Sequence, residues 1–273
     1  MTIDIHPHVI ATDERRYPRA PLGGRQSDWS RERPVSAEQM LAAMDEAGIE
    51  RSVLVQASTC YGHDNSYVAD AVAAHPQRFA GVFSVDMLAP DAPQRIRYWK
   101  ARGLGGLRVF IAGHTTAQEA RLDDPRSFAG WECAVELQIP VCVQVRAPGL
   151  GQLETLLKRF PQARVILDHM ARPVVDDGPP YAKAASLFEL ARYENLYLKL
   201  TTHNLRDAPQ DFLAGVVKLF GAPRIAWGSN FPASDGKLGG LLADARQALA
   251  VLSDAERDWV FFRTAKNLYA RTA

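Results

Sequence analysis

Two histidines, His6 and His8, stand one residue apart directly after the short apolar run Ile3–Ile5. In an extended strand residues i and i+2 point to the same side, so both imidazoles can face one site. His169 follows another apolar run far along the chain. Three imidazoles can bind a divalent metal such as zinc, or bind a carbonyl or carboxylate oxygen as hydrogen-bond donors. The residue types predict a site and leave both uses open.

Polar side chains also lie at or just after the ends of the other apolar runs of the sequence. If these runs are parallel strands of one barrel, their carboxyl ends meet at one face, where the active sites of such barrels lie. We therefore expect these residues to converge with the histidines at one mouth. They are Ser58, Asp86, Arg108, Gln144, Arg146, Arg172, Lys199, His203 and Asn230.

The elements that must position these residues are eight short apolar runs, each followed by a segment with helical spacing. Eight such βα units predict an α/β protein, a single-domain (β/α)8 TIM barrel over residues 1–273. A doubly wound sheet is the alternative, but it would normally carry a glycine-rich turn where this chain has His6-Pro7-His8. The runs are Ile3–Ile5, Ser52–Gln56, Ala80–Val85, Gly106–Val109, Val141–Val145, Val165–Leu167, Leu196–Leu200 and Ile225–Trp227.

The helical segments carry their own start and stop signals. Ser36 is a candidate N-cap with Gln39 at the capping-box position, and Gly48 follows the helix as a stop. We predict helices over Ser36–Ala47, Asn65–Ala74, Ala92–Arg102, Ala129–Leu137, Leu150–Phe160, Tyr181–Tyr193, Asp211–Phe220, Leu238–Leu252 and Asp254–Tyr269. The long irregular segment 11–34, which carries Trp29, is predicted to be a lid-like loop beside the site, because long loops in compact domains usually bind or cover ligands.

Composition narrows the classes of protein. There are 32 basic and 31 acidic residues, so the net charge of +1 gives no global field for nucleic acid or an anionic membrane. No apolar stretch is long enough for a membrane span, and the first ten residues lack the basic region of a signal peptide. The three cysteines have no CxxC spacing and indicate reduced thiols. We expect a cytoplasmic enzyme with a small-molecule partner; the oligomeric state stays open, and a homo-oligomer is one option.

Several motifs together resemble the amidohydrolase superfamily, in its amidohydrolase-2 branch of lactone-processing barrels. That branch includes 2-pyrone-4,6-dicarboxylate hydrolases, sugar lactonases and galactarolactone isomerases. The resemblance spans nearly the whole chain. It rests on Asp4-Ile5-His6-Pro7-His8, Gln56-Ala57-Ser58, Gly62-His63-Asp64-Asn65, Gly106-Leu107-Arg108, Asp168-His169-Met170-Ala171-Arg172-Pro173, Lys199, Gly228-Ser229-Asn230-Phe231-Pro232 and Asn267-Leu268-Tyr269.

The resemblance implies a small anionic lactone or carboxylate as ligand and no required cofactor. It implies that the three histidines polarise the lactone carbonyl without a metal, while Arg108 and Arg172 hold carboxylates and Ser58 lines the site. Bidentate guanidinium groups suit carboxylates, and preorganised N–H donors suit a developing oxyanion. If a divalent metal is present, its ligands are expected to be His6, His8 and His169.

Two departures from the family pattern affect the chemistry. Asn230 replaces the aspartate that ends the last strand, and an amide can neither take a proton from water nor act as an anionic metal ligand. His203 is the candidate replacement base. Strand five offers Gln144 and Arg146, which we expect to share a face and add positive charge to the mouth. We expect Lys199 to pair with an acid there, with Trp29 among the binding residues.

The sequence therefore predicts an enzyme that hydrolyses a small carboxylated lactone. A lactone isomerase is an alternative, because it needs the same carbonyl activation without water. A barrel that binds small anions and has lost catalysis is a second alternative, indicated by Asn230 alone.

Overall fold

The computed structural model describes residues 1–110 and 120–270, except for the side chain of Asp207. Eight parallel strands follow one another in sequence order, as predicted for a (β/α)8 barrel. The doubly wound alternative is thereby ruled out. The strands are β1 (Ile3–Asp4), β2 (Arg51–Val55), β3 (Phe79–Ser84), β4 (Gly106–Phe110), β5 (Val141–Gln144), β6 (Val165–Leu167), β7 (Leu196–Thr201) and β8 (Ile225–Gly228).

The first and last strands close the barrel. The Ile5 amide donates to the Trp227 carbonyl at 3.2 Å, and the His8 amide donates to the Phe231 carbonyl at 2.8 Å. Gly228 permits this approach, because a Cβ at that position would lie 2.5 Å from Cβ of His6. The closure therefore brings the His6 region directly beside the end of β8.

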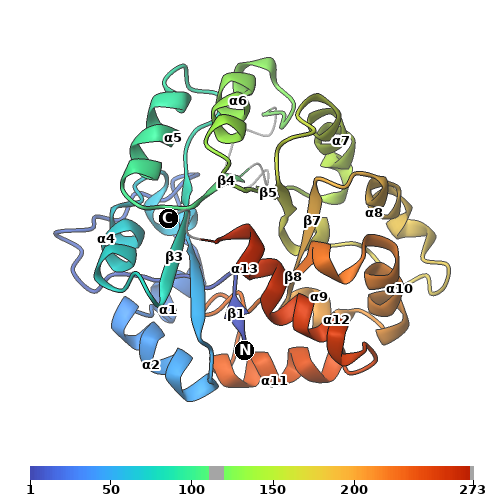
Figure 1. Cartoon of the computed structure of the whole chain (residues 1–273). Coiled ribbons are helices and arrows are strands. Elements are labelled where there is room, and N and C mark those ends of the chain that lie inside the picture. Colours follow the sequence, from blue (N-terminus) through green and yellow to red (C-terminus); the bar gives the residue numbers. More distant parts are fainter. Residues whose placement is uncertain (111–119, 271–273) are drawn as a thin grey trace.

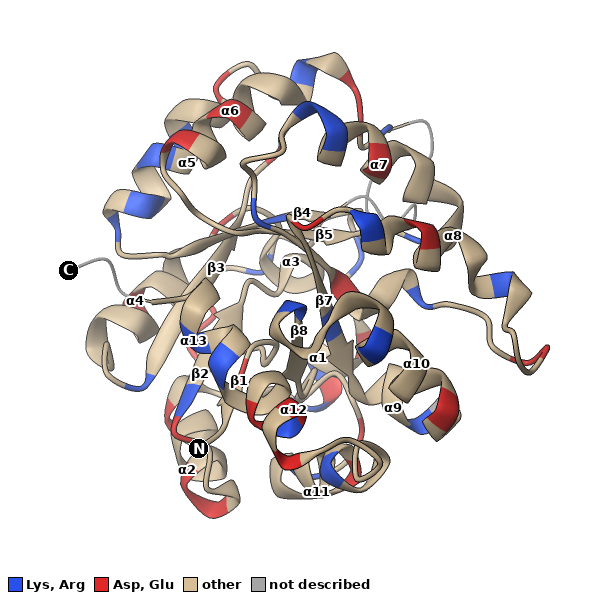
Figure 2. Ribbon diagram, turned by 45° about the vertical axis from the view of Figure 1, so that its right-hand side comes forward, with Lys and Arg blue, Asp and Glu red and all other residues tan. Residues whose placement is uncertain are grey.

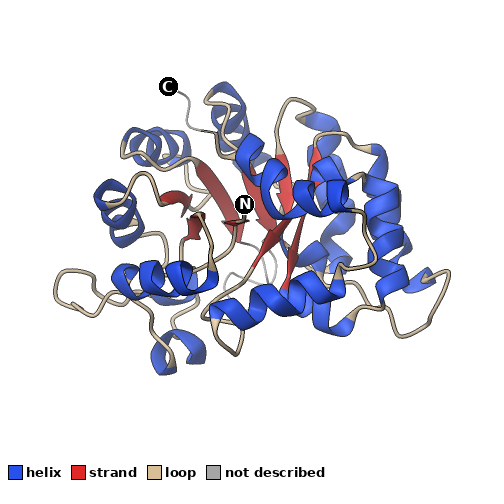
Figure 3. Cartoon of the chain, turned by 60° about the horizontal axis from the view of Figure 1, so that its bottom comes forward, coloured by secondary structure: helices blue, strands red, loops and turns tan. Residues whose placement is uncertain are grey.

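The helices form the outer layer around the strands (Figures 1 and 3). The α-helices are α1 (Asp28–Glu32), α2 (Ala37–Ala47), α3 (Ser58–Tyr61), α4 (Ser66–Ala74), α5 (Ala92–Ala101), α6 (Phe128–Glu136), α7 (Leu150–Arg159), α8 (Ala185–Glu189), α9 (Thr202–Asp207), α10 (Gln210–Phe220), α11 (Leu238–Ala248), α12 (Asp254–Asp258) and α13 (Thr264–Leu268). A π-helical turn, Trp259–Arg263, joins α12 to α13.

Short 3-10 turns complete the connections. They are η1 (Pro125–Ser127), η2 (Ala147–Gly149), η3 (Asp168–Ala171), η4 (Ala182–Ala184), η5 (Leu190–Arg192) and η6 (Ala222–Arg224). Basic and acidic positions occur on the same outer helices, so their charges largely offset one another locally (Figure 2). No helix among the described residues is long and apolar enough to cross a membrane.

Two apolar layers hold the fold together. The larger lies between the strands and the helices and contains Leu54, Phe83, Trp131 and Phe212. The smaller fills the barrel interior, where Ile5, Val55 and Ile166 meet residues of the C-terminal helix such as Leu268. The inner layer supports the mouth from below, so the polar residues above it rest on a packed floor.

The predicted elements agree closely with the observed ones, with four differences. The predicted helix Tyr181–Tyr193 is broken into η4, α8 and η5, and the last helix is interrupted by the π-helical turn. The segment 11–34 is not wholly irregular, because it contains α1. The short helices α3 and α9, which directly follow β2 and β7, were not predicted. The capping box of Ser36 and Gln39 and the left-handed Gly48 are present as expected.

Candidate active site

A pocket of about 180 Å³ opens at the carboxyl ends of the strands. Nine of the residues predicted for the site line it, although they come from seven βα units. These nine are His8, Trp29, Ser58, Arg108, Gln144, His169, Arg172, His203 and Asn230. Ala57, Thr59, Phe110 and Ala233 complete the lining. The geometry therefore brings together most of the residues that the sequence placed at strand ends.

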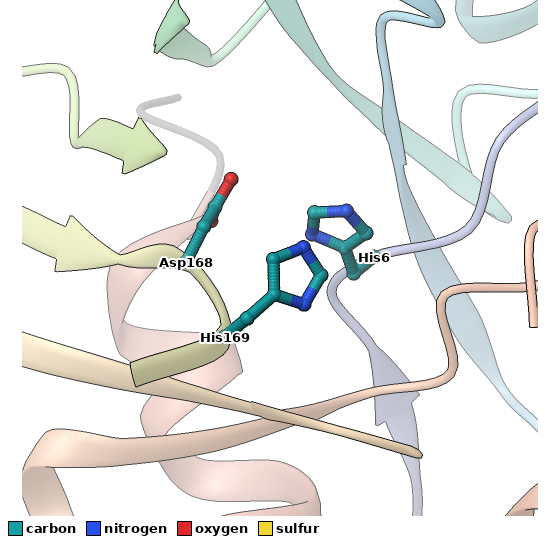
Figure 4. A group of neighbouring side chains, drawn as sticks. All are labelled: His6, Asp168 and His169. Carbon is teal, nitrogen blue, oxygen red and sulfur yellow. The ribbon is translucent and has the colours of Figure 1, made fainter. Parts of the chain in front are cut away.

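His6 lies at the centre of the imidazole cluster, beneath the pocket. Its ring centroid is 4.9 Å from that of His8 and 4.9 Å from that of His169. Figure 4 shows His6 and His169 facing each other with the Asp168 carboxylate beside them. His6 is fully buried, and neither of its ring nitrogens has a hydrogen-bond partner within the described structure. The cluster therefore retains free bonding capacity at both ring nitrogens of His6.

The hydrogen bond of His8 fixes which of its nitrogens carries the proton. Its Nδ1 lies 2.8 Å from the Val55 carbonyl oxygen. A carbonyl can only accept, so Nδ1 carries the hydrogen and Nε2 keeps a lone pair. The Trp29 ring covers this imidazole at a centroid distance of 5.1 Å. In its neutral form His8 is therefore a hydrogen-bond acceptor at Nε2, whereas donation to a carbonyl oxygen, one of the two uses that the sequence left open, would need its protonated form.

His169 stands on an unusual left-handed turn. His169, Met170, Ala171 and Arg172 have φ angles of 55°, 49°, 57° and 54°. This conformation costs roughly 1–2 kcal/mol for each non-glycine residue. Met170 and Ala171 are buried in the core, whereas His169 and Arg172, three residues apart, both reach the pocket. The turn therefore presents an imidazole and a guanidinium together, at a cost that the surrounding packing must offset.

Thr201 and Asn204, which the sequence analysis missed, hold His169 in place. His169 Nδ1 lies 2.7 Å from Thr201 Oγ1, and that hydroxyl donates to Asn204 Oδ1 at 3.2 Å. The Asn204 side-chain amide also donates to the His169 carbonyl at 2.8 Å. Since the Thr201 proton goes to Asn204, His169 donates from Nδ1 and keeps a lone pair on Nε2. The Thr-x-x-Asn spacing after a strand was the available signal.

A buried polar chain, here called the axial network, runs below the pocket. Asp168 pairs with Lys199 at 2.7 Å and with Arg108 at 2.9 Å. Arg108 also donates to the Gln144 side chain above. Below, Lys199 Nζ lies 3.5 Å from Cys142 Sγ, which is 3.4 Å from the Tyr269 hydroxyl. The predicted pairing of Lys199 with an acid is present, and Asp168 is that acid.

Burial sets the protonation states of the site. Burial, with Lys199, His169 and Arg108 nearby, lowers the pKa of His6 well below 6.5. Burial and Arg108 lower the pKa of His8 to about 3, and burial lowers that of His169 despite Asp168. Burial opposes ionisation of Asp168, but Lys199 and Arg108 outweigh it and hold its pKa below the usual value. The site thus has three neutral imidazoles and an ionised Asp168.

Two predicted binding residues lie outside the pocket lining. Lys199 is fully buried because β7 continues to Thr201, which places Lys199 deeper in the barrel interior. Arg146 is exposed because β5 ends at Gln144 and the chain turns into η2, so strand alternation no longer applies. The expectation that both touch the ligand directly is corrected accordingly. Burial lowers the pKa of Arg172, and the charge of Arg146 lowers it further. Asp86 is likewise exposed and lines no part of the pocket.

Asn230 and His203 differ in burial. Asn230 is buried at φ 57°, a left-handed conformation that asparagine tolerates, and its amide donates to Ser234 Oγ at 3.1 Å. His203 is exposed at the start of α9. Ser58 Oγ is buried without a partner in the described structure, so it can still donate to a ligand.

The cluster contains side chains that can bind a divalent metal, but nearby positive charges disfavour a cation there. Ligand atoms of His6, Asp168 and His169 lie within 4.8 Å of one another, and the free nitrogens of His6 suit a cation. His8, the third expected ligand, is not in this group. Both oxygens of Asp168 already face Lys199 and Arg108, so an added cation would sit beside two buried positive charges. The residues therefore fit a divalent metal poorly.

Comparison with known proteins places this fold and site in a family. The Amidohydrolase family (Amidohydro_2) matches residues 3–271, and the chain belongs to it. L-fucono-1,5-lactonase of Burkholderia ambifaria is 27% identical over 245 residues, covering 85% of this chain and 80% of that protein.

Solved structures share the fold at lower sequence identity. A probable 2-pyrone-4,6-dicarboxylic acid hydrolase from Acinetobacter baumannii, with citric acid bound, has a TM-score of 0.75 at 20% identity over 98% of both chains. An amidohydrolase from Burkholderia multivorans, with bound zinc, has a TM-score of 0.77 at 21% identity over 99% of both chains. The barrel prediction and the family resemblance are confirmed.

Proposed function

We propose that the protein is a hydrolase that opens a small lactone bearing a carboxylate. The observation that carries this proposal is the charge of the pocket: Arg108 and Arg172 line it, whereas the Asp168 carboxylate below is already paired with Lys199 and Arg108. An anionic ligand would offset the remaining positive charge. The lactonase relative and the citrate-bound neighbour support a cyclic ester and a carboxylate, respectively.

Arg172 is the proposed carboxylate-binding residue. It stands at the end of the left-handed turn, lines the pocket and has no acidic partner in the described structure. Its guanidinium is exposed before binding, so the ligand would remove it from water. Arg108 is held by Asp168 and Gln144 and therefore supplies a fixed positive charge at the floor.

The proposed reaction is attack of water on the lactone carbonyl. Ser58 Oγ has no other partner and Arg108 is preorganised, so these donors would stabilise the oxyanion that develops on the carbonyl oxygen. The water proton would pass to Nε2 of His8 or His169. When the ring C–O bond breaks, the imidazolium would return this proton to the leaving oxygen. The product is a hydroxy acid whose new carboxyl group ionises near neutral pH, which releases one proton per turnover.

Substrate charge would tune these bases. The imidazoles of the empty site resist protonation because they are buried beside positive charges. A bound carboxylate adds negative charge and raises their pKa, so the base becomes stronger when the proposed substrate is present. A neutral lactone lacks this effect, which provides a physical reason for selectivity. Asn230 would orient the water or a substrate oxygen without taking the proton.

We expect the reaction to proceed without a metal ion, because the ion pairs of Asp168 disfavour a divalent cation. A metal bound by His6 and His169 would polarise the carbonyl instead, which is the alternative use of the same residues. The three cysteines are free and buried, which supports the expectation of a reducing compartment such as the cytoplasm.

The test is turnover on a panel of carboxylated and neutral lactones, with product analysis by NMR. The proposal expects ring opening, one released proton per turnover and a preference for carboxylated substrates. Isomerisation would give a second lactone without proton release. Binding without turnover of any lactone would favour the alternative of a barrel that only binds small anions. His8→Gln and His169→Gln variants then separate the two candidate bases.

A further inference from the structure

A second cavity, of about 570 Å³, lies at the end of the barrel opposite the candidate active site. Its walls come from residues at the amino ends of β2 to β6, the carboxyl ends of α4, α5 and α6, and the last described residues, Leu268–Ala270. Figure 1 shows these three helices as neighbours on the rim of the barrel. The volume is within the roughly 300–1,000 Å³ typical of small-molecule sites.

The charge of this lower cavity is one-sided. Arg51, Lys100, Arg102 and Arg164 line it, and the described lining contains no acidic residue. The Nε atom of Arg51 is buried without a hydrogen-bond partner. Neither Arg51 nor Lys100 has an ion pair or side-chain hydrogen bond in the described structure, although buried donors are normally satisfied. Arg51 and Lys100 therefore line the cavity with positive charges that no described side chain neutralises.

Structural roles account for only part of this charge. Arg102 pairs with Asp70 at 3.1 Å, while Arg164 donates to the carbonyls of Gln138 and Asn267. Carbonyl groups leave the charge of Arg164 uncompensated. Each of the three helix ends contributes only about half a negative charge. The three helix ends together supply less negative charge than the three full positive charges of Arg51, Lys100 and Arg164.

The rest of the lining is apolar. Val72, Phe79, Leu137, Pro140 and Leu268 form much of the wall. Tyr269 belongs both to this lining and to the lower end of the axial network, through its contact with Cys142. A ligand here would combine anionic groups with some apolar surface. It would occupy a position separated from the upper pocket by the packed barrel interior.

We propose that the lower cavity binds a small molecule carrying two or more anionic groups, either phosphates or carboxylates, with Arg51 and Lys100 as its principal ligands. Guanidinium and ammonium groups are the usual partners of both anion types. This site is distinct from the proposed catalytic pocket, where Arg172 has the equivalent role. The proposal does not depend on lactone hydrolysis.

The experiment is isothermal titration calorimetry of the full chain with pyrophosphate and, separately, with citrate. It compares wild type with Arg51→Gln, Lys100→Gln and the double variant. Lys218→Gln, which removes an exposed charge on α10, is the matched control, and Arg172→Gln reports binding to the upper pocket. Circular dichroism melting of each variant verifies folding, and Lys100→Gln provides a mild change if Arg51→Gln does not fold.

The proposal expects at least one probe to bind. Loss of one charged hydrogen-bond partner should weaken that binding about tenfold or more. Lys218→Gln and Arg172→Gln should retain it, and the tighter probe identifies the anion type. Three results would overturn the proposal: no binding of either probe at millimolar concentration, unchanged binding in the Arg51 and Lys100 variants, or binding that disappears with Arg172→Gln.

Discussion

Replacing Arg172 with glutamine tests the proposed carboxylate recognition with the least disturbance of the fold. Arg172 lines the pocket, is exposed in the empty site and pairs with no acidic residue in the described structure. Glutamine, like arginine, has a Cβ, so the free-energy cost of the left-handed backbone at φ 54° is about the same in the variant as in the wild type. Arg108 is less suitable, because removing one partner of a buried ion pair costs roughly 3–5 kcal/mol of stability.

The expected magnitude follows from one lost charged hydrogen bond. Such a bond contributes about 1.5–3 kcal/mol, and about 1.4 kcal/mol corresponds to a factor of ten. Arg172→Gln should therefore lower kcat/KM for a carboxylated lactone roughly 10- to 150-fold. A neutral lactone of the same ring size should lose much less, since it has no carboxylate to bind.

Steady-state kinetics on this substrate pair is the assay. Arg146→Gln is the matched control, because Arg146 is a neighbouring arginine that lies outside the pocket lining. Its variant should keep nearly the wild-type ratio of kcat/KM for the two substrates. The reasoning is refuted if Arg172→Gln reduces both substrates equally, or if Arg146→Gln has the larger effect on the carboxylated one.

Three further predictions concern the bases and the end of β8. Because His8 has a pKa of about 3 and His6 and His169 are also lowered, the pH profile of kcat/KM should show no histidine limb near 6.5. These histidines stay neutral in the folded state but protonate below pH 6.5 when unfolded. As the pH decreases below about 6.5, the unfolding free energy should therefore decrease by up to about 1.4 kcal/mol per pH unit for each histidine. Denaturation that does not depend on pH between pH 5 and 7 would contradict this. Thr201→Val removes the acceptor for His169 Nδ1–H, so kcat should fall about tenfold while Thr201→Ser retains most activity; equal kcat in the two variants would exclude this positioning role. Asn230→Asp restores a base at β8 and should leave hydrolysis intact or faster by NMR product analysis, whereas His203→Ala should slow hydrolysis if His203 is the replacement base. Unchanged products and rates in both variants would exclude both residues.

The strands and most of the pocket could be predicted because their signals are local. Runs buried on both faces are short and apolar, so Val165–Leu167 matches β6 and the other runs differ by one or two residues. Parallel strands of a barrel must end at one face, which is why Arg108, His169 and Asn230 meet although they are distant in sequence.

The remaining features depend on where strands end and on backbone strain. Arg146 was wrongly predicted to face the pocket, because β5 ends at Gln144 and side chains alternate only within a strand. Lys199 was wrongly predicted to reach the ligand, because β7 continues to Thr201, beyond its apolar run. The left-handed turn that carries Arg172 contains no glycine, so the residue types do not indicate it in the sequence. The proton positions of His8 and His169 depend on acceptors from other strands, Val55 and Thr201, which only the folded structure brings together.

The most direct test of the proposed function is hydrolysis by metal-depleted protein. Protein treated with a chelator and verified metal-free by elemental analysis would be incubated with a carboxylated lactone, while NMR follows the ring and a pH indicator follows proton release. The account predicts a ring-opened hydroxy acid, one proton per turnover and a rate that added zinc does not increase. Failure to open the ring without zinc, or formation of an isomeric lactone without proton release, would contradict it.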